Sequence, residues 1–303
     1  MVLGPKYYTM YTKPVGTICR NHGLNHHFYA DDSQLYLSFK PTDCVTVREA
    51  VRRVEGCLND ILSWMHSNML KLNANITEVI LFSSKDINKI PSDLSINVGR
   101  GTILLSNCAR NLGTWLDSNM NMEKHVNSVC RSCYAQLRHI GHIRQHLTIH
   151  ATNSLVNYLV TSRIDYCNSL LNGFPKTTLN KIQHVQNTAA RLITRTSRRS
   201  HITPVLKDLH WLPIQYRIQC KILVKTYKAL QGQSPLYVRN LLQVYKPTRN
   251  LRSQNNATAL VVPKSRKVMF GDRSFATAAP RLWNSLPEGI RDSGSLAIFK
   301  ISV

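Results

Sequence analysis

Two adjacent carboxylates, Asp31 and Asp32, lie between two short apolar segments of the sequence. Residues 26–30 precede them and residues 33–39 alternate after them, so the pattern predicts a β-hairpin with the two acids in its turn. Mg²⁺ prefers hard carboxylate oxygens and keeps part of its coordination shell for water and substrate phosphate. The hairpin therefore predicts metal-assisted phosphoryl transfer, with Asp31 and Asp32 as the metal ligands. A solvated acidic pair is the alternative, because acidic residues are common in exposed turns.

The elements around this hairpin indicate an α+β fold. Apolar residues recur at intervals of three and four over residues 44–67, which predicts a helix. Strands are expected over residues 78–83 and 103–105, with a loop or hairpin over 83–101 between them. Strands with a helix packed on one side form the α+β class.

Charge divides the chain near residue 120. Residues 1–120 contain 12 Lys or Arg and 10 Asp or Glu, whereas residues 121–303 contain 27 and 6. The net charge of the whole chain is +23. An excess of this size favours a polyanionic partner, with nucleic acid first and an anionic membrane surface second. No apolar run approaches the ~18–20 residues of a membrane-spanning helix, so we expect no membrane partner.

Helices dominate the basic part of the chain. Apolar periodicity predicts helices over residues 121–147, 148–163, 178–195 and 214–230. Frequent prolines and short mixed segments predict an irregular C-terminal part. The expected organisation is a domain over 1–120, a basic helical region over 121–232 and an irregular basic region over 233–303.

Two groups of cations in the basic part are candidates for contact with phosphates. They are Arg191, Arg195, Arg198 and Arg199, and then Lys221, Lys225 and Lys228. The three lysines share one helix face, and the arginines have no acidic residue near them in the sequence. Lys and Arg neutralise backbone phosphates and release counterions, so both groups predict nucleic-acid binding. A solvated helix surface is the alternative for each group.

Aromatic residues and cysteines of the basic part leave further alternatives open. Aromatic rings stack on bases, but at helical spacing they more often belong to the core; the candidates are Tyr158, Tyr166, Trp211, Tyr216 and Tyr227. Cys130 and Cys133 precede His139 and His142, a set of residues that could bind Zn²⁺. The interval from Cys133 to His139 is too short for a C₂H₂ zinc finger, so a place in the helix core is favoured over a zinc site. Eight dispersed cysteines and no apolar leader favour a reduced intracellular protein, nuclear or cytoplasmic rather than secreted.

Several motifs together resemble the reverse transcriptases of non-LTR (LINE-type) retrotransposons. They are Tyr29-Ala30-Asp31-Asp32-Ser33-Gln34-Leu35, Asn68-Met69-Leu70-Lys71-Leu72-Asn73, Thr77-Glu78, Asn111-Leu112-Gly113, Ser162-Arg163-Ile164-Asp165-Tyr166-Cys167-Asn168-Ser169, Val185-Gln186-Asn187, His210-Trp211-Leu212-Pro213 and Leu282-Trp283-Asn284. The resemblance covers nearly the whole chain and corresponds to the C-terminal part of such a polymerase.

The resemblance implies a right-hand polymerase, with an incomplete palm over 1–120 followed by a helical thumb-like region and a basic C-terminal region. Asp31 and Asp32 would be the paired palm aspartates, and Tyr29 would lie near the primer end. The implied activity is RNA-directed DNA synthesis with Mg²⁺, an RNA template and a DNA primer. Deoxynucleoside triphosphates would bind only if the metal site were completed.

Two departures from the family pattern concern catalysis. Residues 1–30 contain no Asp or Glu, so the carboxylate that would bridge two metal ions is missing, and we expect the chain to be truncated within the palm. Ile76 stands where the resemblance leads us to expect Lys, two residues before Glu78; Lys71 is the nearest alternative. We therefore expect no polymerisation by this chain alone. A non-catalytic nucleic-acid-binding protein and an unstable fragment are the alternatives.

Overall fold

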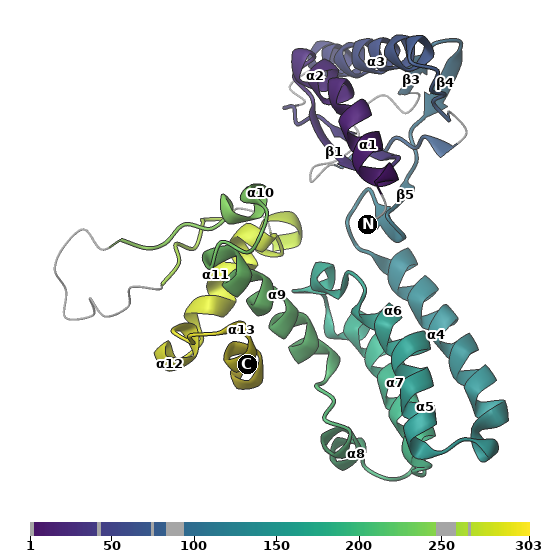
Figure 1. Ribbon diagram of the computed structural model, residues 1–303, viewed down its shortest axis with the longest axis vertical. Helices are drawn as coiled ribbons and strands as arrows, with labels where there is room; N and C mark the ends of the chain where they lie inside the picture. Colours follow the sequence, from purple (N-terminus) through teal and green to yellow (C-terminus); the bar gives the residue numbers. More distant parts are fainter. Residues whose placement is uncertain (1–2, 41–43, 74–75, 83–93, 247–258, 266–267) are drawn as a thin grey trace. The chain divides into compact units, whose positions relative to one another are not determined.

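The computed structural model describes residues 3–40, 44–73, 76–82, 94–246, 259–265 and 268–303 (Figure 1). The chain forms two compact units, Met1–Asn121 and Met122–Val303, which we call unit 1 and unit 2. The described residues form helices and small antiparallel sheets, in agreement with the expected α+β class. The assignment of these parts as palm and thumb remains a prediction.

The helices of unit 1 are α1 (Gly4–Tyr11), α2 (Lys13–Asn21) and α3 (Cys44–Ser67). The prediction of a helix over 44–67 is confirmed by α3, whose apolar stripe buries Val47, Leu58 and Ile61. No helix was predicted before residue 22. Both α1 and α2 carry a proline in the first turn, where the missing N–H costs no helical hydrogen bond.

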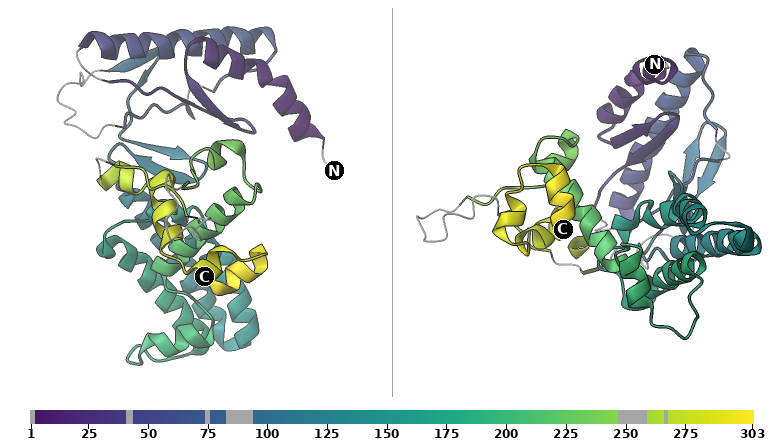
Figure 2. Two further views of the ribbon diagram at one scale, coloured as in Figure 1. Left: turned by 90° about the vertical axis from the view of Figure 1, so that its left-hand side faces the viewer. Right: turned by 60° about the horizontal axis from the view of Figure 1, so that its bottom comes forward.

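The predicted hairpin is formed by β1 (Asn25–Tyr29) and β2 (Asp32–Tyr36), with Tyr29 directly opposite Asp32. The turn is Ala30-Asp31, one residue earlier than expected, so Asp32 is the first residue of a strand. Ala30 has a φ of 54°, a conformation that a Cβ atom disfavours. Helices α2 and α3 pack on one face of this hairpin (Figure 2).

Two further hairpins belong to unit 1: β3 (Ser95–Val98) with β4 (Gly101–Leu104), and β5 (Cys108–Asn111) with β6 (Thr114–Asp117). The strand expected over 78–83 is wrong, because the described residues 78–82 contain only one bridge, from Val79 to Leu105. Residues 83–93 of the expected loop or hairpin lie outside the described residues. The β5–β6 hairpin was not predicted; its turn is Leu112-Gly113, and both residues have positive φ.

Unit 2 is helical, as predicted. Its main helices are α4 (Glu123–Ile143), α5 (Ile149–Val156), α6 (Ser162–Asp165), α7 (Lys176–Thr194) and α9 (Ile214–Leu230), which confirm the four expected segments within a few residues. Helices α4 and α7 lie side by side (Figure 1). Helix α8 (Ile202–Asp208) follows α7 and was not predicted.

A π-helical turn, Asn157–Thr161, joins α5 to α6 in one continuous helical segment. Thr152, Val156, Val160 and Ile164 are all buried, at intervals of four residues. In an α-helix each interval of four residues rotates the side chain by about 40°, which would carry the later residues away from the core. The wider π turn compensates for this rotation, so the sequence spacing explains why the helix widens here.

The C-terminal part is more regular than expected. It contains α10 (Leu236–Arg239), α11 (Phe275–Asn284), α12 (Glu288–Arg291) and α13 (Leu296–Ser302). Tyr227 of α9 stacks on Phe299 at 4.6 Å between ring centroids, and Trp283 lies 5.6 Å from the same ring. Pro235 and Pro287 immediately precede helices rather than exclude them, which is why proline frequency misled the sequence prediction.

Candidate functional site

The tip of the β1–β2 hairpin presents the predicted catalytic residues to solvent. Tyr29 and Asp32 are directly opposite each other, so their side chains lie on the same face of the hairpin. Both aspartates are exposed, and Tyr29 is 67% exposed. Asp31 occupies the turn beside them. This face can therefore receive a ligand without any rearrangement of the core.

The opposite face of the same hairpin anchors it to unit 1. Phe28 and Leu35 pack against the core cluster that contains Cys19 and Cys57. His26 stacks on Phe28 at 4.8 Å, and a Cβ on Gly16 would approach the His26 ring to 2.8 Å, which explains a glycine there. Burial lowers the pKa of His26, and the nearby charges of Arg20 and His27 lower it further. The hairpin tip is thus solvent-exposed and its base is fixed.

Two hydrogen bonds involving the end of β5 connect motifs that lie far apart along the chain. Gln34 Nε2 donates to Asn111 Oδ1 at 2.6 Å, which joins β2 to the end of β5. The main-chain N–H of Arg110 donates to Glu78 Oε2 at 2.9 Å. The structure therefore brings together three motifs of the resemblance, those at residues 29–35, 77–78 and 111–113. Sequence reasoning did not assign these contacts, because their partners lie 77 and 32 residues apart.

The donor set at the hairpin tip fits one Mg²⁺ ion better than two. Mg²⁺ is commonly held by one or two carboxylates together with waters and substrate phosphates, which Asp31 and Asp32 satisfy. Within the described ranges, no group of three or more His, Cys, Asp or Glu side chains is placed to hold a metal. Ile76 is 73% exposed and provides no proton donor at its position. A third carboxylate that could bridge two ions is not among the described groups.

The arginines at the end of α7 have different roles. Arg191 Nη2 donates to the carbonyl of Ser200 at 2.9 Å, and its Nε donates to the carbonyl of Ser197 at 3.3 Å. Arg195 has a φ of 57° at the helix end and donates to the carbonyl of Arg144 at 3.2 Å. Arg198 and Arg199 are exposed. The four arginines therefore differ in role, because Arg191 and Arg195 donate hydrogen bonds to main-chain carbonyls and the other two are exposed.

Arg144 stabilises this region, and the sequence analysis did not identify it. Its guanidinium donates to the carbonyls of Leu147, Leu192 and Ile193 at 2.7–2.8 Å, and the residue is 7% exposed. Burial lowers the pKa of Arg144, and the charge of Arg195 lowers it further. Helix C-termini carry partial negative charge, so a buried cation is stabilised there. Arg144 therefore caps the end of α7.

The lysines on α9 are also partly engaged. Lys221 Nζ donates to the carbonyl of Asp165, and Lys225 Nζ lies 3.2 Å from Ser169 Oγ. Burial lowers the pKa of Lys225, and the neighbouring Lys221 lowers it further. Lys228 is half-buried on the same helix. The row that the spacing predicted exists, but Lys221 contacts the last residue of α6 and Lys225 contacts the segment after it.

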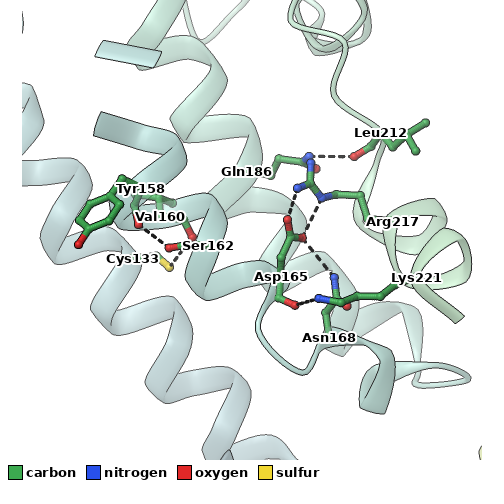
Figure 3. Close-up of polar contacts among 10 residues, drawn as sticks. All are labelled: Cys133, Tyr158, Val160, Ser162, Asp165, Asn168, Gln186, Leu212, Arg217 and Lys221. Atoms are coloured by element: carbon green, nitrogen blue, oxygen red, sulfur yellow. Dashed lines mark hydrogen bonds and ion pairs between the residues drawn. The ribbon is translucent and has the colours of Figure 1, made fainter. Parts of the chain in front are cut away.

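Asp165 is the centre of a polar network in unit 2 (Figure 3). Arg217 binds its carboxylate through both Nε and Nη2, with the Nε contact at 3.0 Å. Asn168 Nδ2 donates to the same carboxylate at 3.2 Å. Gln186 Nε2 donates to the carbonyl of Leu212 at 2.9 Å nearby. The Gln186–Leu212 hydrogen bond joins the motifs at residues 185–187 and 210–213, and Asp165 connects the motif at 162–169 to α9, so these motifs have a structural role.

A second, separate group of side chains donates to carbonyls of the π turn (Figure 3). Ser162 Oγ donates to the carbonyl of Tyr158, and Cys133 Sγ donates to the carbonyl of Val160 at 3.8 Å. Tyr158 itself points away from the helices and is 77% exposed. A wide turn frees main-chain carbonyls, so these donors stabilise it.

The aromatic candidates divide into exposed and buried residues, and one of the candidate cysteines is buried. Tyr158, Tyr166 and Tyr216 are exposed and remain candidates for base stacking, whereas Tyr227 is buried and Trp211 packs against the α7–α8 core. Cys133 is fully buried, and burial raises its pKa to about 11. No helix among the described residues is long and apolar enough to cross a membrane.

Both acidic residues in the α4–α7 segment are neutralised within unit 2. Glu123 pairs with Lys181 at 3.4 Å, and Asp165 pairs with Arg217. No Asp or Glu occurs between Asp165 and Asp208. The positive charge at the end of α7 therefore has no acidic neighbour along the chain, and it stays available to an external anion.

Comparison with known proteins supports the resemblance. The chain is 25% identical over 271 residues to the probable RNA-directed DNA polymerase from transposon BS of Drosophila melanogaster. The chain is similar to a transposon reverse transcriptase. The match covers 86% of this chain and 29% of that protein, so the chain spans less than a third of the length of this relative. No protein-family model and no solved structure matches the chain.

This similarity confirms the resemblance to transposon reverse transcriptases that the motifs predicted, and it confirms that the chain is reverse-transcriptase-like. The roles of individual residues, the metal and the specific template and primer stay predictions.

Proposed function

We propose that this chain is part of an RNA-directed DNA polymerase of a LINE-type retrotransposon, with a nucleotidyl-transfer hairpin in unit 1 and a nucleic-acid-binding unit 2. The observation that carries the proposal is the hairpin tip, where Tyr29 and Asp32 share an exposed face beside Asp31. The similarity to a transposon RNA-directed DNA polymerase supports it. RNA template and DNA primer are the proposed partners.

Asp31 and Asp32 would hold Mg²⁺ at the hairpin tip, with Asp31 in the turn as the more accessible ligand. A bound Mg²⁺ would supply Lewis-acid stabilisation of the transferring phosphoryl group. Tyr29 would pack against the sugar of the primer end and orient its 3′-hydroxyl. The Gln34–Asn111 and Arg110–Glu78 hydrogen bonds would keep the β5–β6 hairpin against this face.

Catalysis would require a further carboxylate. Two-metal transfer places one carboxylate between the ions, and the described residues bring no third acidic group to Asp31 and Asp32. We therefore propose that the chain, as it stands, binds nucleic acid and one metal ion but does not extend a primer. Deoxynucleoside triphosphates would bind productively only in a completed site.

A purely electrostatic nucleic-acid-binding protein is the second candidate function. The charge of residues 121–303 and the internal pairing of Glu123 and Asp165 favour it. Both candidates predict binding of RNA and DNA by unit 2, so nucleic-acid binding alone does not separate them. Metal binding at the hairpin tip does separate them.

Electron paramagnetic resonance of Mn²⁺, used as a spectroscopic substitute for Mg²⁺, tests this difference. We expect the full chain to bind Mn²⁺ and the Asp31→Asn/Asp32→Asn variant to lose that binding. Glu49→Gln, which removes an exposed carboxylate from α3, serves as the control and should bind as the unmodified chain does. Equal Mn²⁺ binding by the chain and the double variant would contradict the polymerase proposal and leave the electrostatic one.

A further inference from the structure

The segment between α7 and α8, residues 195–201, is folded around one arginine side chain. The Arg191 guanidinium donates to two main-chain oxygens there, the carbonyls of Ser197 and Ser200. Ser200 N–H also donates to the carbonyl of Ser197 at 3.2 Å, and Arg199 N–H donates to Ser197 Oγ at 3.3 Å. We call residues 195–201 the α7–α8 loop.

Arg191 holds two carbonyl oxygens of the loop, those of Ser197 and Ser200, so the loop is fixed before any ligand binds. Within the described part of the chain, the N–H groups of Thr196, Ser197 and Arg198 donate to no protein acceptor. Successive outward N–H groups form an anion-binding concavity in many phosphate sites. Three consecutive N–H groups of this loop, as far as the described residues show, therefore have no protein acceptor that would compete with an anion.

The side chains of the loop add charge of the same sign. Arg198 and Arg199 are exposed, and neither guanidinium contacts a carboxylate in the described ranges. The loop begins at the C-terminus of α7, whose last carbonyls, those of Leu192 and Ile193, are already occupied by Arg144. Negative charge at the helix end is therefore compensated, and it does not repel an approaching anion.

We propose that the α7–α8 loop is a preformed phosphate-binding loop, in which Arg198 and Arg199 each contact a backbone phosphate of bound nucleic acid and Arg191 is a positioning residue. This inference rests on the proposed nucleic-acid binding by unit 2. It assigns different roles to arginines that sequence reasoning treated as one cluster. The loop would bind phosphates without base specificity, because its guanidinium and N–H groups would contact only the backbone of the nucleic acid.

Fluorescence anisotropy with single-stranded RNA, measured over a range of salt concentrations, tests the loop. Each phosphate contact contributes about 0.7 to the slope of log affinity against log salt for single strands, so Arg198→Gln/Arg199→Gln should lower the slope by about 1.4. If the two proteins bind equally at about 1 M salt, this difference in slope makes binding by the double variant about 25-fold weaker at about 0.1 M. Arg48→Gln/Arg52→Gln, which removes two exposed charges from α3 of unit 1, should leave the slope within about 0.3.

A double-mutant cycle tests the positioning role of Arg191. We expect Arg191→Gln to weaken binding on its own but to add little in the Arg198→Gln/Arg199→Gln background, since the loop then has nothing left to position. Arg191→Lys should not restore affinity, because one ammonium cannot reach both carbonyls as the planar guanidinium does. Additive losses, or full rescue by Arg191→Lys, would show that Arg191 acts only through its charge and would overturn the positioning role.

The two proposals fail in different ways. If the unmodified chain shows no salt-dependent RNA binding, nucleic-acid binding by unit 2 is wrong. If the unmodified chain binds and Arg198→Gln/Arg199→Gln leaves both affinity and slope unchanged, only the phosphate-binding loop is wrong. Inorganic phosphate at millimolar concentration, added as a competitor, should displace little RNA, because a polymer makes several contacts at once; complete displacement would indicate a site for free phosphate instead.

Discussion

Replacement of Arg144 by methionine tests how α7 and its loop are stabilised. Arg144 is 7% exposed, and its guanidinium makes three hydrogen bonds of 2.7–2.8 Å to main-chain carbonyls. A hydrogen bond from a charged donor contributes about 1.5 kcal/mol to stability. Three such bonds give about 4.5 kcal/mol, from which about 1.5 kcal/mol is subtracted because the variant no longer buries an unpaired charge. We expect Arg144→Met to lower the free energy of unfolding of unit 2 by about 3 kcal/mol.

The assay is thermal unfolding followed by circular dichroism at 222 nm, which reports the helices. For a unit of this size, about 3 kcal/mol corresponds to a decrease in Tm of about 6–12 °C. Arg144→Lys keeps the charge and one hydrogen bond, so its Tm should lie between those of Arg144→Met and the unmodified chain. Arg138→Met replaces an exposed residue of α4, the helix that ends immediately before Arg144, and should change Tm by less than about 2 °C. If Arg144→Met melted within 2 °C of the unmodified chain, the capping role of Arg144 would be refuted.

Three other perturbations have defined outcomes. Burial lowers the pKa of His125 below its usual 6.5, so the unfolded chain binds a proton at a higher pH than the folded chain does. The stability of the chain should therefore fall as the pH falls below about 6.5. His125→Gln should flatten that dependence in Tm measurements from about pH 5 to about pH 8. Burial raises the pKa of Cys57 to about 12 and that of Cys133 to about 11, so iodoacetamide at pH 8 should label neither in the folded chain and both in urea, as read by mass spectrometry. Asp165→Asn breaks the pair with Arg217 and should accelerate hydrogen exchange in α6 and α9, with no change expected in α3.

The sequence predicted elements whose side chains alternate or recur along one segment. Helix α3 and the β1–β2 hairpin were found because their apolar residues follow a single period over many positions. The β5–β6 hairpin was missed because its strands are four residues long and its turn places Leu112 at positive φ, which the residue type does not indicate. The π turn was missed because its cause, the shared burial of residues four positions apart, becomes visible only when the helix packs.

The candidate site residues also divide into those with a local sequence signal and those without one. Asp31 and Asp32 were predicted because they are adjacent acids between two apolar strands and lie in a motif that resembles those of reverse transcriptases. The roles of Arg144 and Arg191 could not be predicted, because their partners are main-chain carbonyls that packing or loop folding brings within reach. The pairing of Asp165 with Arg217 spans 52 residues and gives no local signal. The count of charged residues located the basic part of the chain, whereas the structure distinguishes the cations that stabilise the fold from those that remain exposed.

Primer extension is the most direct test of the proposed incomplete polymerase. The purified chain would be mixed with an RNA template, an annealed DNA primer, deoxynucleoside triphosphates and Mg²⁺, with Asp31→Asn/Asp32→Asn as the control. We expect no extension by either protein, while both bind the RNA–DNA duplex with a steep dependence on salt. Mg²⁺-dependent extension by the unmodified chain, abolished in the double variant, would show that a carboxylate completes the site and would contradict the proposal that this chain alone is inactive.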